Sequence, residues 1–278
     1  MITEWNKADF HKCRKLLHEQ SHLEAMAVVE KINPGRIFVD DVDHPASGVI
    51  WLGNNDGFIF FGSEQNEGFN HPLNQFIDHV IIPEAKKVGL KEFEAIGNHQ
   101  KWNETIERIF AHRKLGSWNQ RVYSLPQDSD ITSNKPAIEQ GYQMVSITEK
   151  LLKNTDNAVT NIEFLQAKIT EFWSSTEDFL RNGMGYGMAY QRELVSVCFS
   201  GFVAGNIHCI DIETLEAHQG KKLAQILAHC FVEECLENNK LPYWDCMEMN
   251  KASVAVAEHI GLRNVWNYVG YDFSLEST

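Results

Sequence analysis

The residues most suggestive of chemistry lie where a predicted strand passes into a predicted helix. The stretch 207–224 reads IHCIDIETLEAHQGKKLA, an apolar strand, a polar turn and a helix that begins at Gly-Lys-Lys. The free N–H groups and the positive dipole end of a helix N-terminus bind phosphates, and a glycine allows close approach to the backbone. A helix N-terminus usually disfavours cations, so the presence of Lys221 and Lys222 there suggests that an anion binds at this point. The stretch predicts a pyrophosphate site at Gly220; the alternative is an ordinary connection with solvated lysines.

A second stretch makes this prediction more specific. Residues 250–262 read NKASVAVAEHIGL and follow a predicted strand at 242–246. In this order and spacing, the two stretches together resemble the GNAT superfamily of N-acetyltransferases, over about residues 140–273. The resemblance implies an α+β fold with a mixed sheet, the GNAT acyl-CoA N-acyltransferase fold. The residues that carry it are Gln219, Gly220, Lys221, Lys222, Leu223 and Ala224 in the loop, and Asn250, Ser253, Glu258, Gly261 and Leu262 in the second motif.

Two positions depart from the family pattern. Lys222 stands where the loop has its central glycine, and Ala257 stands where the second motif has a tyrosine that protonates the departing thiolate. This version of the second motif looks more like a two-domain GNAT subfamily, to which the zwittermicin-type resistance acetyltransferases are similar. In that subfamily the N-terminal half is a degenerate GNAT-like domain. The N-terminal half of this chain has no phosphate loop of its own, since residues 61–72 read FGSEQNEGFNHP.

The resemblance implies acetyl-CoA as cosubstrate and assigns residues to it. Backbone groups of Ile212 and Thr214 would bind the pantetheine arm, and residues 219–224 would take the pyrophosphate. Asn250 and Ser253 would line the thiol end. The sequence has neither an HExxH motif nor a Cys/His cluster, so we expect no metal site.

Acetyl transfer to an amine also requires a base, because an ordinary amine of pKa ~10.4 is protonated near pH 7. His208 is the first candidate, since histidine suits this task and some GNAT enzymes keep a catalytic histidine eleven residues before the position of Gln219. Glu213 is the second candidate, and strand alternation places its side chain on the face opposite His208. A partly buried structural histidine and a solvated strand-end carboxylate are the alternative interpretations.

These residues depend on the strands and helices around them. Apolar spacing in the second half predicts a strand at 206–214, a helix at about 222–238, a strand at 242–246 and a helix at 252–260. The first half has a similar order of hairpin, helix, strand, helix and strand. A degenerate internal duplication would explain the similarity, and two unrelated α+β domains are the alternative.

A polar segment bounded by prolines, 126–136 (PQDSDITSNKP), is the best candidate for a linker. We therefore predict two domains. Residues 1–130 form an N-terminal α+β domain that is degenerate and GNAT-like, and residues 138–278 form the GNAT acetyltransferase domain.

The composition limits the partners of the chain. Its 278 residues include 25 Lys plus Arg and 38 Asp plus Glu, a net charge of −13. Phosphate-rich partners need many cations, so we expect neither nucleic acid nor membrane, and a cationic small molecule is the easier partner. No apolar run has the length of a membrane span, and the first ten residues carry no apolar signal segment. The six cysteines show no CxxC spacing, which is typical of reduced thiols. We expect a cytoplasmic protein, and a homodimer stays open.

The function that these observations favour is an N-acetyltransferase. It would move an acetyl group from acetyl-CoA to a primary amine of a small molecule. A non-catalytic CoA-binding regulatory module is the alternative, favoured by Ala257. A structural interaction domain without a ligand is a third interpretation. Titration with acetyl-CoA separates the third from the first two, and a thiol-release assay with a panel of amines separates the first from the second.

Overall fold

The chain forms two compact units. The computed structural model describes residues 1–17, 22–53, 57–126, 135–155 and 157–276. One unit comprises Met1–Asn119 with Tyr268–Thr278, and the other comprises Gln120–Asn267. Both boundaries fall inside strands, namely β6 (Gly116–Ser124) and β12 (Arg263–Ser274). Most of the predicted linker, 126–136, lies outside the described residues.

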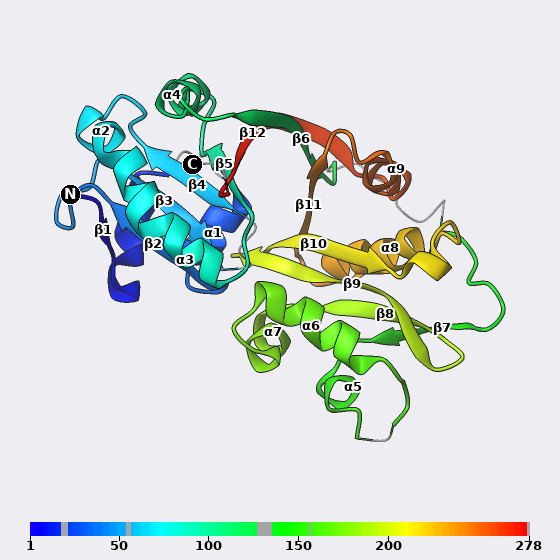
Figure 1. The fold of residues 1–278 in the computed structure, drawn as a ribbon. Coiled ribbons are helices and arrows are strands. Elements are labelled where there is room, and N and C mark those ends of the chain that lie inside the picture. Colours follow the sequence, from blue (N-terminus) through cyan, green and yellow to red (C-terminus); the bar gives the residue numbers. More distant parts are fainter. Residues whose placement is uncertain (18–21, 54–56, 127–134, 156, 277–278) are drawn as a thin grey trace. The chain divides into compact units, whose positions relative to one another are not determined.

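The first unit contains strands in the order β1-β2-β3-β4-β5-β12 (Figure 1). The predicted hairpin is confirmed, since β3 and β4 pair antiparallel, while β4 and β5 pair parallel. The strands are β1 (Thr3–Glu4), β2 (Gly35–Val39), β3 (Ser47–Leu52), β4 (Phe58–Gly62) and β5 (Glu92–Gly97). The helices are the 3₁₀-helix η1 (Lys7–Lys15), α1 (Leu23–Val29), α2 (Glu67–Phe76), the π-helix η2 (Ile77–Ile81), α3 (Ile82–Lys87) and α4 (Trp102–Ile109).

The helical stretch between β4 and β5 is longer than the positions of its two prolines predict. The sequence suggests a helix confined between Pro72 and Pro83, but Pro72 lies inside α2. The π-helical turn η2 then leads directly into α3. Pro83 stands in the first turn of α3, a position that tolerates the missing N–H.

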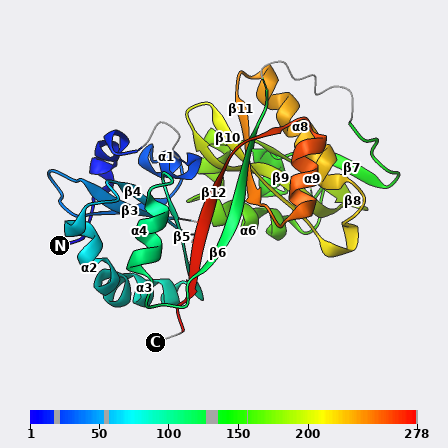
Figure 2. The same ribbon diagram turned by 90° about the horizontal axis from the view of Figure 1, so that it is seen from above.

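The second unit contains strands in the order β6-β11-β10-β9-β8-β7. Helices α6 and α8 cover opposite faces of this sheet (Figure 1), and Figure 2 shows α8 and α9 side by side. The strands are β7 (Tyr142–Ser146), β8 (Gly185–Tyr190), β9 (Glu193–Ala204), β10 (Ile207–Thr214) and β11 (Leu241–Met247). The helices are α5 (Glu149–Lys153), α6 (Ile162–Phe172), α7 (Thr176–Asn182), the 3₁₀-helix η4 (Glu216–His218), α8 (Leu223–Glu237) and α9 (Lys251–His259).

The same order of elements occurs twice along the chain, as the sequence predicts. In the first half, β3, β4, the helices α2 to α3, β5, α4 and β6 follow one another; in the second half, β9, β10, α8, β11, α9 and β12 do so. The strand directions repeat as well, because β9 and β10 are antiparallel while β10 and β11 are parallel.

The final strand of each series pairs with a strand of the other half. The end of β6 pairs antiparallel with β11, with Val122 opposite Asp245. The end of β12 pairs antiparallel with β5, with Gly270 opposite Ile96, and Phe273 stacks on Phe93 at 4.8 Å between ring centroids. The predicted domains 1–130 and 138–278 therefore each leave out a strand that the corresponding compact unit contains.

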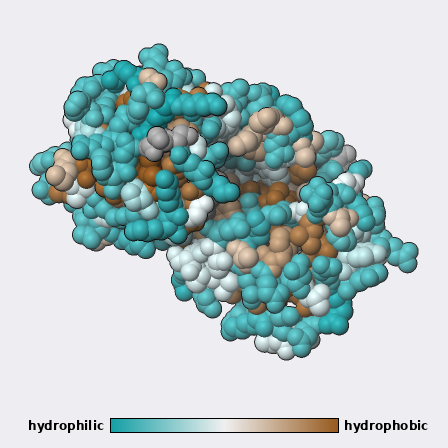
Figure 3. Space-filling view, in the orientation of Figure 1, coloured by the Kyte–Doolittle hydropathy of each residue, from teal (hydrophilic) through white to brown (hydrophobic). Residues whose placement is uncertain are grey.

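On the face of the molecule that Figure 3 shows, hydrophilic residues dominate and apolar residues form scattered patches. Of the helices in the described part of the chain, none is long and apolar enough to cross a membrane.

His208 belongs to the interior of the second unit. Its side chain is 2% exposed, and its Nδ1 lies 2.9 Å from the hydroxyl oxygen of Ser200 on β9. Burial, with a smaller effect from the charge of Lys240, lowers the pKa of His208 to about 4. His22 in the first unit is similarly buried, its Nε2 lies 3.1 Å from the Gly97 carbonyl, and burial lowers its pKa to about 4.

In a strand exchange between the two halves of the chain, β6 pairs with β11 and the end of β12 pairs with β5. This exchange predicts that the C-terminal domain fails to fold when it is cut out at the linker. Residues 138–278 expressed alone should aggregate, because β11 loses the β6 strand and the end of β12 loses β5, which exposes strand edges. Co-expression with residues 1–130 should restore a soluble complex, measured by co-purification through a tag on one fragment. A soluble, monomeric 138–278 fragment would contradict the exchange.

The buried histidines predict that stability declines in mild acid. Their folded-state pKa values lie below the ordinary ~6.5, so the unfolded chain takes up protons first as the pH falls. The free energy of unfolding should therefore decrease from pH ~6.5 to pH ~4, by at most ~1.4 kcal/mol per pH unit for each histidine. Urea denaturation across this range measures the slope. His208→Gln should flatten it, whereas the control His79→Gln, at an exposed position, should leave it unchanged. An unaltered slope in His208→Gln would show that this ring does not titrate on unfolding.

Candidate active site

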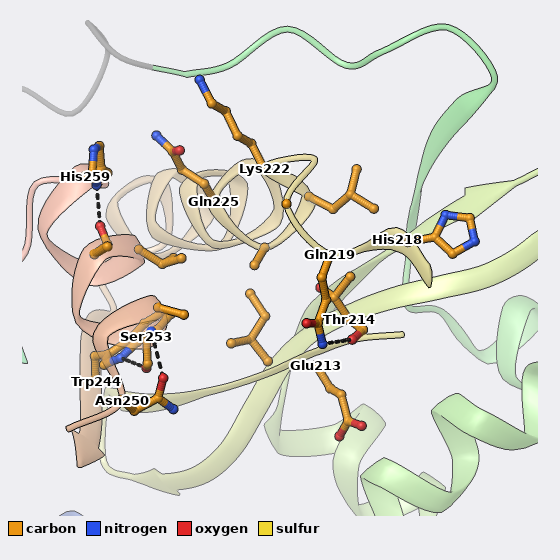
Figure 4. A pocket seen from close by; sticks show the side chains of 17 residues that line it. Glu213, Thr214, His218, Gln219, Lys222, Gln225, Trp244, Asn250, Ser253 and His259 are labelled. Atoms are coloured by element: carbon orange, nitrogen blue, oxygen red, sulfur yellow. Dashed lines mark hydrogen bonds between the residues drawn. The ribbon is translucent and has the colours of Figure 1, made fainter. Parts of the chain in front are cut away.

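The second unit contains a cavity of about 730 Å³ bounded by β10, the start of α8, β11 and α9 (Figure 4). Most of the residues that the sequence singles out lie around it. The predicted residues that line the cavity are Ile212, Glu213, Thr214, Gln219, Gly220, Lys222, Leu223, Ala224, Asn250 and Ser253. Two motifs that lie some thirty residues apart in the sequence therefore face one shared space.

The cavity lies where two parallel strands separate. β10 and β11 pair only from Ile207 opposite Leu241 to Cys209 opposite Tyr243, although both strands continue further. Beyond that point β10 stays paired with β9, and β11 pairs with β6. The separation coincides with a β-bulge, because the register between β9 and β10 shifts between His208 and Ile210. A bulge bends the strand and increases its twist, which gives the separation a local cause.

The turn before α8 has a backbone that favours glycine at two positions. Gly220 has φ 75° and Lys222 has φ 61°, both in the left-handed region. Lys222 therefore has a backbone conformation that favours glycine, the residue that the family pattern has at this position. A Cβ built on Gly220 would meet no atom within 4 Å, so the space beside the turn is open.

The first turn of α8 presents hydrogen-bond donors to this space. No side chain caps the helix, and its first turn contains no acidic residue. The N–H of Ile226 is bonded to the Lys222 carbonyl at 3.0 Å, and the N–H groups of residues 223–225 precede that bond. These groups and the helix dipole make the end of α8 that faces the cavity electropositive.

Four of the predicted residues take part in hydrogen bonds within the site. The Gln219 amide donates to the Thr214 carbonyl at 3.1 Å, which closes the turn (Figure 4). One of the backbone groups of Thr214, a residue predicted to bind a ligand, is therefore already engaged. The Asn250 side chain accepts the N–H of Ser253 at 3.1 Å and caps α9, and the Ser253 hydroxyl accepts the indole N–H of Trp244 at 3.0 Å.

Two predicted residues do not line the cavity. The Lys221 ammonium lies over the rings of Tyr142 and Tyr190, at 5.4 and 6.0 Å from their centroids. His208 lies at the paired end of β10, four residues before Ile212, which is about 13 Å along a strand. It packs against Ser200 in the interior instead, so its position does not support the predicted role of base.

Glu213 lines the cavity, but its carboxylate is directed away from α8 (Figure 4). It forms an ion pair with Lys168 on α6 at 2.6 Å, on the opposite face of the sheet. Lys168 also pairs with Glu171 at 3.2 Å. Ile210 and Ile212, by contrast, pack with α8 residues, so β10 alternates as the sequence predicts.

Sequence reasoning missed several lining residues. On α9 a signal was present, because residues 252, 255, 256 and 259 have the spacing of one helical face. Ala257 is fully buried and packs in the core of the unit rather than lining the cavity. The missed residues are His218, Gln225, Trp244, Ala252, Ala255, Val256 and His259.

The arrangement suits a long ligand with a phosphate group and an apolar or amide-bearing arm. The start of α8 offers a positive end with backbone donors. Ile212, Leu223 and Val256 provide apolar wall. The gap between β10 and β11 leaves strand edges beside the cavity that can pair with amide groups of a ligand.

Comparisons with known proteins agree with this geometry. A family model described as GNAT acetyltransferase matches residues 14–271. An uncharacterized N-acetyltransferase of Bacillus subtilis (strain 168), YdfB, is 26% identical over 246 residues, which cover 88% of each chain. The crystal structure of a GCN5-related N-acetyltransferase-like protein from Streptococcus suis 89/1591 has a TM-score of 0.67 at 17% identity and covers 96% of this chain and 98% of that one. A tandem GNAT protein from the clavulanic acid biosynthesis pathway has a TM-score of 0.61 at 12% identity and covers 100% and 99%.

The family model extends across both halves of the chain and so includes the first unit, which lacks a phosphate loop. The mixed-sheet fold with a GNAT-like N-terminal half, expected from the sequence, is confirmed by the similarity to a tandem GNAT structure over the full length. The chain belongs to the GNAT acetyltransferase family and is an acyltransferase of the N-acetyltransferase type.

Proposed function

We propose that this enzyme transfers an acetyl group from acetyl-CoA to a primary amine of a small molecule. The observation that carries the proposal is the position of the uncapped N-terminus of α8 beside the point where β10 and β11 separate. Such a helix end binds a pyrophosphate, and unpaired strand edges next to it suit the amides of a pantetheine arm. GNAT enzymes generally use acetyl-CoA.

The residues around the cavity fit this cosubstrate. Residues 219–224 would hold the pyrophosphate, since Gly220 leaves open space and the turn carries no acid. The backbone of Ile212 and the part of Thr214 not engaged by Gln219 would bind the pantetheine arm. Asn250 and Ser253 would line the thiol end. When bound, acetyl-CoA would supply an acetyl group that is already activated as a thioester.

We propose Glu213 as the proton acceptor for the amine, because His208 is buried at the other end of β10. The Glu213 carboxylate faces the side of the sheet opposite α8, so an amine and the phosphate-bearing part of acetyl-CoA would approach from different faces. The ion pair with Lys168 orients this carboxylate, and a positioned base contributes typically 10²–10⁴-fold to a rate. A proton taken up there can pass to solvent, because the Glu213 side chain is 44% exposed.

The charge and the cysteines support two further parts of the proposal. A net charge of −13 attracts a cationic amine and opposes nucleic acid. The six cysteines are free and buried, which suits a reducing compartment and therefore a cytoplasmic enzyme.

Gly220→Asp tests the pyrophosphate site. The new carboxylate would face a phosphate, and two like charges ~4 Å apart near a protein surface cost about 1–4 kcal/mol. The affinity for acetyl-CoA, measured by calorimetry, should fall by about 10-fold or more. Gly89→Asp is the matched control, because Gly89 also has a positive φ (84°) and open space around it but lies in the first unit. Equal affinity in the wild type and Gly220→Asp would refute the assignment.

Glu213→Gln tests the base. In a thiol-release assay with the best amine of a panel, kcat should fall by ~10²-fold or more, while the KM for acetyl-CoA changes by only a few-fold. Glu171→Gln is the control, because it removes the other carboxylate on Lys168 and should leave kcat nearly unchanged. His208→Gln should also keep most of the wild-type kcat. A large kcat loss in His208→Gln with none in Glu213→Gln would return the role to the histidine. Binding of acetyl-CoA without thiol release for any amine would favour the non-catalytic module.

A further inference from the structure

One rim of the cavity carries three polar side chains, two of which, His259 and Gln225, the proposed function does not use. Figure 4 shows His259, Gln225 and Lys222 along this rim, on the side of the cavity away from Glu213. His259 ends α9, while Gln225 lies in the first turn of α8. The rim is thus built from two elements that meet beside the proposed pyrophosphate turn.

The His259 ring is oriented by its own helix. Its Nδ1 donates to the carbonyl of Ala255, one turn earlier on α9 (Figure 4). This hydrogen bond leaves Nε2 as the ring atom that a ligand in the cavity can use. In the imidazolium form Nε2 is an N–H donor with positive charge, which is what a phosphate requires.

The charge balance at this rim favours an anion. Glu213 is the acidic residue among those that line the cavity, and its carboxylate is paired with Lys168 on the far face of β10. Lys222 adds an ammonium group on the same rim as His259, and Gln225 adds amide N–H donors.

The other basic groups near the turn are already engaged. Lys221 lies over two tyrosine rings, and the hydroxyl of Tyr142 is 2.7 Å from His218 Nδ1. An additional anionic group of a ligand bound at the turn therefore finds its partners at the rim formed by His259, Gln225 and Lys222.

We propose that His259 and Gln225, assisted by the charge of Lys222, bind the 3′-phosphate of acetyl-CoA. The inference rests on the proposed function, because it takes the pyrophosphate to lie at residues 219–224. The 3′-phosphate is a third phosphate group, separate from the pyrophosphate and attached to the ribose. The rim makes this enzyme selective for CoA thioesters that carry it.

Acetyl-3′-dephospho-CoA, which lacks only this phosphate, provides the test. Calorimetry with both ligands should show that the wild type binds acetyl-CoA on the order of 10-fold or more tightly, since a hydrogen bond to a charged group is usually worth this much. His259→Ala should lose about 10-fold in affinity for acetyl-CoA and less than 2-fold for the dephospho ligand. Gln225→Ala should show the same pattern with a smaller loss. Lys153→Ala, which removes an exposed cation on α5 outside the cavity, should change neither affinity.

The outcomes separate this inference from the proposed function. Equal affinity of the wild type for the two ligands, or an equal loss for both in His259→Ala, would overturn the 3′-phosphate site and leave acetyl-CoA binding intact. Binding of neither ligand by the wild type would overturn the proposed function, and the rim site with it. The dephospho ligand also controls for folding, because it needs the same turn and cavity.

Discussion

The structure of the site depends on the separation of β10 from β11. These parallel strands share only three register positions before each follows another partner, β9 on one side and β6 on the other. The β-bulge between His208 and Ile210 lies at the same point and bends the strand pair there. If β10 and β11 stayed paired along their whole length, no unpaired strand edge would lie beside the start of α8. A ligand could then not pass between the two strands from one face of the sheet to the other.

Strand exchange keeps the separation open. β11 needs an antiparallel partner once it has left β10, and the end of β6 provides one, with Val122 opposite Asp245. That partner strand comes from the N-terminal half of the chain, which has no phosphate loop. The N-terminal half is thus a structural requirement of the second unit, since its last strand is part of the sheet that borders the cavity. In return, β12 completes the sheet of the first unit through β5.

Position within the fold decides what each histidine can do. His208 lies on β10 and His259 at the end of α9, and neither lies in a metal-binding motif of the sequence. His208 is enclosed where β10 is still paired, and burial lowers its pKa to about 4, so the neutral ring acts as a hydrogen-bonding core residue. His259 stands at the exposed end of α9, where Nδ1 is used by the helix and the residue lines the cavity.

The sequence by itself determined the parts of the site whose geometry is local. A strand, a Gly-Lys-Lys turn and a helix form the uncapped helix start from neighbouring residues, and Asn250 caps the helix that begins immediately after it. The helical spacing of residues 252, 255, 256 and 259 also indicates the face of α9 that lines the cavity.

Tertiary structure alone decided the remainder. Whether His208 or Glu213 can reach a substrate depends on where β10 leaves β11 and on Lys168 from α6. The exchange of β6 and β12 joins residues more than a hundred positions apart, such as Val122 with Asp245. Such pairing leaves no local pattern in the sequence, because any strand with a suitable apolar face can occupy either edge.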